Sequence, residues 1–298
     1  MTERADNTRP FATEVADGWL CGPWRQPTNN SSHESGTIHD DTTARALGFR
    51  SGTIAGSIHM EQFVPLLDEA FEIDWQRRGS ISLWFREPSI DGESVRAMVH
   101  NDTLSRRHVR MLTKDGIEVL TGSASAGMDH QGAVSERLAL IRPGAAPRIL
   151  APVAGGFAAH GLATRVTQAD VEKRLPILTE ARAQYATCDT YKRCVAPMSS
   201  AVHAMRVFEE ALPIERSDFV GLFGAIEWQW IDGPMYTEHA YEVSGRVVAV
   251  TDSPRTEMLW TETFLCELET GREVARMLML SRVLKATSRL WNADSPST

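Results

Sequence analysis

The sequence predicts an α+β protein in which two antiparallel sheets each wrap one central helix and join into one continuous sheet. Three observations lead to this prediction. Two apolar segments have helical spacing, each is followed by short β-rich segments separated by turns, and this order occurs twice along the chain. A chain of 298 residues is long enough for two medium-sized domains that bury a large core.

The first unit, residues 1–141, is expected to contain a buried helix over residues 55–71. Apolar side chains recur there at helical spacing, and Pro65 predicts a kink or an early end. Ahead of it, residues 1–16 are expected to be a loose lead-in and residues 18–21 a short edge strand. The strands expected after the helix cover residues 80–85, 94–101, 106–113 and 117–126, with Asp115-Gly116 as a hairpin turn.

The second unit, residues 157–298, is expected to repeat this plan after a Pro-, Gly- and Ala-rich linker over residues 142–156. Its helix is predicted over residues 197–212, where FEEAL echoes the LDEAF of the first helix 141 residues earlier. The tail after Trp291 is expected to be disordered. The predicted strands cover residues 224–230, 239–251, 256–268 and 273–285.

Composition excludes several classes of protein. The net charge of −8 argues against nucleic-acid binding, which requires a basic surface. No apolar run approaches the ~18 residues of a membrane span, and the polar N-terminal segment is unlike a signal peptide. We therefore expect a cytoplasmic protein without membrane partners. The four cysteines form no CxxC pair, which argues against a zinc site, and are expected to be reduced thiols.

The segment from His33 to Met60 carries the main chemical signal. It contains IHDDTTARALGFRSGTIAG, in which a histidine and two acids precede a Gly-Phe pair and a glycine opening the first helix. This pattern resembles the hydratase motif of MaoC-like acyl dehydratases. His39 matches the family histidine, Asp41 the acidic position two residues later, and Gly56 the helix-opening glycine. Glu34 stands where the family has its catalytic aspartate.

The resemblance implies a double hot-dog fold and a hydratase or dehydratase acting on an acyl thioester, either acyl-CoA or acyl-carrier-protein, without a cofactor or metal. Adding water to a 2-enoyl thioester requires a base for the water and a proton for the α-carbon, which an imidazole and a carboxylate can share. His39 is the expected imidazole, and its partner is Glu34, Asp40 or Asp41. Backbone N–H groups at Ala55 and Gly56 would stabilise the thioester oxygen. The second unit lacks the motif, so one site per chain is expected.

Other interpretations of these residues remain open. Asp40 and Asp41 precede a helical segment and could act as helix caps. His59 and His203 lie on the two central helices and are expected to be core or interface residues. Two arginine pairs, Arg77-Arg78 and Arg106-Arg107, could meet coenzyme A phosphates or lie in solvated turns. Thioester hydrolysis, another reaction on the same scaffold and non-catalytic acyl binding are the alternative functions, and pairing of two copies through sheet edges is an alternative to a monomer.

Overall fold

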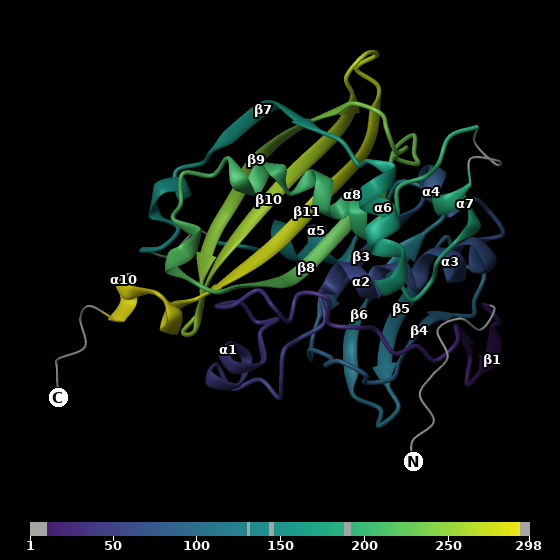
Figure 1. The fold of residues 1–298 in the computed structure, drawn as a ribbon, viewed down its shortest axis with the longest axis horizontal. Helices are drawn as coiled ribbons and strands as arrows, with labels where there is room; N and C mark the ends of the chain where they lie inside the picture. The colour runs from purple at the N-terminus through teal and green to yellow at the C-terminus, as the bar shows by residue number, and fades with distance from the viewer. Residues whose placement is uncertain (1–10, 130–131, 143–145, 188–191, 293–298) are drawn as a thin grey trace.

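The computed structural model describes residues 11–129, 132–142, 146–187 and 192–292 (Figure 1). One antiparallel 11-stranded sheet dominates it, in the order β1-β2-β4-β5-β6-β3-β8-β11-β10-β9-β7. The strands are β1 (Glu14–Ala16), β2 (Trp19–Cys21), β3 (Ser80–Phe85), β4 (Val95–His100), β5 (Arg106–Thr113), β6 (Glu118–Ser125), β7 (Ala158–Thr164), β8 (Gly221–Trp230), β9 (Tyr241–Asp252), β10 (Thr256–Glu267) and β11 (Glu273–Leu284).

The described helices are short and connect or cover the sheet. They are α1 (Asp41–Ala46), α2 (Gly56–Glu61), α3 (Phe63–Phe71), α4 (Trp75–Arg78), α5 (Ala133–Ala139), α6 (Gln168–Arg174), α7 (Ala183–Ala186), α8 (Met198–Met205), α9 (Val207–Glu210) and α10 (Arg289–Asn292). Figure 1 shows α2, α3 and α8 crossing the same face of the sheet.

The two halves of the sheet join where β3 pairs with β8. Ser80 lies opposite Gln229 and Leu83 opposite Ile226, so backbone hydrogen bonds continue from one unit into the other. The predicted single continuous sheet is therefore confirmed. The eight strands predicted after the two helices are all present, with ends shifted by three residues or fewer.

Pro65 was expected to kink or end the helix, and the structure has a helix boundary three residues before it. The apolar segment forms two helices, α2 and α3, that meet at Gln62. Proline has no N–H to donate, and its ring crowds the carbonyl four residues earlier, which here belongs to Glu61. Both helices are nearly enclosed: Met60, Phe63 and Leu67 are among the buried side chains that form the main core with the inner face of the sheet.

Several local expectations were wrong. The run at residues 18–21 is an inner strand, β2, because β1 pairs with its other side within the predicted lead-in. Strand β7 was not predicted, because its sequence AAHGLAT has a single β-branched residue, at its end. Helix α5 was not predicted either; it covers Trp84, Ala225 and Trp260 on the outer face of the sheet.

The structure describes three of the four cysteines and every helix that could be tested for length and apolar character. Cys194 is disulfide-bonded, so the expectation of reduced thiols is wrong for this residue, whereas Cys21 and Cys266 are free. Cys188 and the tail after Asn292 lie outside the described residues. Within the described ranges, no helix has both the length and the apolar character needed to cross a membrane.

Candidate active site

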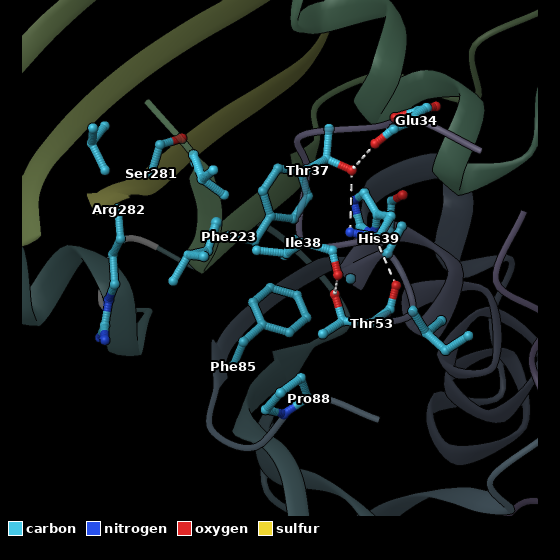
Figure 2. A pocket seen from close by; sticks show the side chains of 18 of the residues that line it. Glu34, Thr37, Ile38, His39, Thr53, Phe85, Pro88, Phe223, Ser281 and Arg282 are labelled. Carbon is cyan, nitrogen blue, oxygen red and sulfur yellow. Dashed lines mark hydrogen bonds between the residues drawn. The ribbon is translucent and has the colours of Figure 1, made fainter. Parts of the chain in front are cut away.

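A cavity of about 670 Å³ lies between the two units. The first unit contributes the loop over residues 34–39, the start of α2 and the segment after β3. The second unit contributes the end of α9, the start of β8 and the end of β11. Figure 2 shows His39 and Thr53 on one side of the cavity and Ser281 and Arg282 on the other, with Phe85 and Phe223 between them.

His39 is held in one orientation at the cavity wall. Its Nδ1 lies 2.8 Å from the carbonyl oxygen of Thr53 (Figure 2). A carbonyl oxygen can only accept a hydrogen bond, so Nδ1 carries a proton. In the neutral form of the ring this places the lone pair on Nε2. Among the described residues His39 Nε2 has no hydrogen-bond partner. The atom is not sealed in the protein interior, so a ligand can reach it. His39 can therefore accept a proton at Nε2 from a ligand in the cavity.

The loop that carries His39 is fixed by its own backbone and by neighbouring polar side chains. Thr53 N–H donates to the Ile38 carbonyl over 2.9 Å, which pairs this loop with the chain entering α2. Asn29 Nδ2 donates to the His39 carbonyl over 2.7 Å, and His39 N–H donates to Thr37 Oγ1 over 3.2 Å. These bonds hold the imidazole beside the start of α2 before any ligand arrives.

The start of α2 also faces the cavity. The Gly56 and Ser57 N–H groups donate to no acceptor in the part of the chain that the structure describes, and Ile58 N–H makes the first bond of the turn, to the Ala55 carbonyl. A Cβ at position 56 would lie 2.7 Å from the Phe85 ring and 3.2 Å from that of Phe223. Only glycine therefore fits between these rings without displacing one of them.

The three candidate acids occupy different places. Glu34 lines the cavity with an exposed side chain, and no hydrogen bond between its carboxylate and His39 is present among the described residues. Asp40 caps α1 by accepting from Thr43 N–H and Oγ1, and these bonds lower the pKa of its carboxyl. Asp41 accepts from Ser51 Oγ and Gly52 N–H, which lowers its pKa in the same way. Neither aspartate lines the cavity.

The corresponding helix start in the second unit is closed by a carboxylate. Glu61, a fully buried residue of α2, accepts from Ser199 N–H at the start of α8 over 2.6 Å and from the Tyr185 hydroxyl over 3.1 Å. This buried carboxyl group accepts from a backbone N–H at the start of α8, whereas the equivalent N–H groups at the start of α2 have no acceptor within the described residues. The two helix starts therefore differ in whether a side chain occupies them.

Sequence reasoning missed the polar residues that the second unit brings to the cavity. Glu209 on α9 is buried and accepts from Arg206 over 2.8 Å and from Arg216 over 3.2 Å. The Arg206 guanidinium also lies 4.9 Å from the centre of the Phe223 ring. No motif signals these residues, because the tertiary fold brings them beside a loop about 170 residues earlier in the chain.

His59 is the second histidine at the cavity. It is buried, its Nε2 lies 2.7 Å from Ser89 Oγ, and its Nδ1 has no partner in the described chain. Burial lowers the pKa of His59 to about 4, so the ring is neutral near pH 7. The expectation of a core residue is confirmed for His59, whereas the side chain of His203 is exposed.

Burial of His59 should make the protein sensitive to acid. In the unfolded chain, the His59 side chain binds a proton below its ordinary pKa of 6.5. In the folded protein it binds that proton only near pH 4. The free energy of unfolding should therefore fall as the pH drops through this window, by up to about 3 kcal/mol. His59→Gln should remove that part of the pH dependence in urea melts between pH 7 and 4. A wild-type pH slope in His59→Gln, matching that of the exposed control His33→Gln, would contradict the assignment.

Comparison with known proteins identifies the fold. No protein-family model and no curated protein matches the sequence. Among solved structures, a conserved hypothetical protein from Mycobacterium tuberculosis described as a double hot-dog aligns over 88% of this chain and 93% of its own, with TM-score 0.56 and 14% identity. A putative MaoC-domain dehydratase from Chloroflexus aurantiacus aligns over 92% and 94%, with TM-score 0.58 and 9% identity. A MaoC-like dehydratase aligns over 91% and 97%, with TM-score 0.50 and 10% identity.

The chain therefore has the double hot-dog fold, and this is the scaffold on which those dehydratases are built. Within the described residues, no group of three or more His, Cys, Asp or Glu side chains is placed to hold a metal ion.

Proposed function

We propose that this protein is a hydratase or dehydratase of acyl thioesters and that His39 is its proton-transfer group. The observation that carries the proposal is the orientation of His39: Nδ1–H donates to the Thr53 carbonyl, and Nε2 is free beside the start of α2. A neutral imidazole held in this way is suited to act as a general base.

In the hydration direction, His39 Nε2 takes a proton from water as the water oxygen bonds to C3 of a 2-enoyl thioester. The electron pair of the C2=C3 double bond moves toward the thioester carbonyl, whose oxygen gains negative charge. The free N–H groups of Gly56 and Ser57 would stabilise that charge. A proton delivered to C2 completes the 3-hydroxyacyl thioester, and dehydration follows the same steps in reverse.

Glu34 is the acid that we assign to the proton at C2. It is the only one of the three candidate acids whose residue lines the cavity; Asp40 and Asp41 are engaged in caps and turns. The Glu34 side chain is exposed, so it can move toward a bound thioester without breaking a side-chain hydrogen bond formed within the described structure.

Glu34→Gln should therefore lower the turnover of a 2-enoyl thioester by about 10²-fold, the scale of a lost general acid. Asp40→Asn is the matched control, because asparagine caps a helix as well as aspartate does, and it should change turnover less than twofold. The assay follows loss of enoyl-thioester absorbance, with thiol release measured in parallel. A larger loss of turnover in Asp40→Asn than in Glu34→Gln would show that Asp40 is the acid. Release of thiol without any change at the double bond would show that the protein hydrolyses the thioester and does not hydrate it.

A further inference from the structure

Two arginines, Arg86 and Arg282, line the cavity. Arg86 follows the last residue of β3, and Arg282 lies on β11 opposite Leu222 of β8. Both line the cavity, and neither forms an ion pair or side-chain hydrogen bond within the described chain. Figure 2 shows the Arg282 guanidinium pointing away from His39, with Phe223 between the two residues.

Arg282 is held in place by close packing. A Cβ at position 224 would lie 2.9 Å from Arg282 Nε, so the absence of a side chain at Gly224 leaves room for the guanidinium stem. Arg282 Nε is buried and has no partner in the described chain. Burial and the nearby charge of Arg86 lower the pKa of Arg282. The fold thus keeps two like charges near each other and leaves a buried donor unsatisfied, which costs free energy unless an anion binds.

The other carboxylates at the cavity do not neutralise this pair. Glu209 already accepts from Arg206 and Arg216. Glu87 also lines the cavity, but it forms no ion pair with either arginine. Glu34 belongs to the loop that carries His39. In a chain with a net charge of −8, two guanidinium groups that no carboxylate of the described residues opposes indicate an anion site.

We propose that Arg86 and Arg282 bind the phosphate groups of coenzyme A and so hold the carrier of the thioester substrate. This inference rests on the proposed function, because it is the thioester that brings a phosphorylated carrier to the cavity. Two guanidinium groups match the several negative charges of coenzyme A better than the single charge of a phosphopantetheine phosphodiester. Arg77-Arg78 and Arg106-Arg107, the pairs considered from sequence, do not line the cavity.

The test is calorimetric binding of desulfo-coenzyme A, 4′-phosphopantetheine and pantetheine to the full chain. The double variant Arg86→Gln/Arg282→Gln should bind desulfo-coenzyme A about tenfold more weakly than wild type. The matched control Arg77→Gln/Arg78→Gln removes two adjacent exposed arginines outside the cavity and should change the dissociation constant less than twofold. Arg86→Gln alone, at an exposed residue, should weaken binding about threefold, and it keeps the test valid if the loss of Arg282 unfolds the protein.

Equal binding of desulfo-coenzyme A by wild type and the double variant, or no binding by wild type, would overturn the proposal. A variant effect as large for phosphopantetheine as for desulfo-coenzyme A would overturn the choice of coenzyme A and favour a carrier protein. Binding is measured without turnover, so it separates the two hypotheses. An inactive protein with arginine-dependent binding would refute only the hydratase, and an active one with arginine-independent binding would refute only this site.

Discussion

His39→Ala should lower the turnover of a 2-enoyl thioester by about 10³-fold, within the range for loss of a general acid–base group. The substitution removes the cavity imidazole whose Nδ1 is bonded to the Thr53 carbonyl and whose Nε2 has no partner among the described residues. The loss should appear in kcat more than in KM, because His39 acts on the proton and not on the acyl chain. Steady-state rates of enoyl-thioester loss measure both constants.

The same substitution should leave the fold intact. His39 is half-buried and makes one side-chain hydrogen bond, so its loss should cost about 1 kcal/mol of unfolding free energy. His33→Ala, on the same loop but exposed and outside the cavity lining, is the control and should retain full turnover. Wild-type kcat in His39→Ala would remove the residue from the mechanism, and equal losses in both variants would point to the loop and not to the imidazole.

Glu257→Ala should produce the largest loss of stability, about 4 kcal/mol, because it leaves several buried donors without an acceptor. Glu257 is completely buried on β10. Its Oε1 accepts from Arg148 N–H over 2.8 Å, Ile149 N–H over 3.1 Å and Trp291 Nε1–H over 2.6 Å, and its Oε2 accepts from Leu150 N–H over 2.8 Å. One carboxylate therefore fastens both the connection between the units and the C-terminal helix to the sheet.

Urea unfolding followed by tryptophan fluorescence would measure this effect. Glu269→Ala removes an exposed carboxylate in the turn after β10 and should stay within about 0.5 kcal/mol of wild type. If Glu257→Ala unfolds at the wild-type midpoint, the connection between the units is not held by this residue.

The repeated helix-and-strand plan could be predicted because each element carries a local pattern. β-rich segments between turn residues, which became β3 to β6 and β8 to β11, and helical spacing around Met60 and Met205 are properties of neighbouring residues. The missed elements lack such a pattern. β7 contains mostly alanine and glycine, and β1 covers three residues at the edge of the sheet. Both are strands because a neighbouring strand offers its hydrogen bonds, a condition that their own residues do not encode.

The candidate site could be predicted only in part. The spacing of His39, Gly56 and the acids indicated one cluster, and the structure brings His39, Gly56 and Glu34 to one cavity. The sequence could not separate Glu34 from Asp40 and Asp41, because capping a helix and facing a cavity are equally compatible with an acid next to a helix. Nor could it indicate Glu209 or Arg282, which reach the cavity from the other unit.

The sequence by itself determined the duplicated architecture and the segment that carries the histidine, since both follow from periodicity and short-range spacing. The tertiary structure decided which acid shares a cavity with His39 and which helix start binds the Glu61 side chain. It also decided where Arg86 and Arg282 lie, neither of them in an ion pair with any residue that the structure describes. The closure of one helix start by Glu61 and the placement of the two arginines depend on contacts between residues more than a hundred positions apart. Local sequence patterns do not encode such contacts, because they exist only where the sheet joins the two units along β3 and β8.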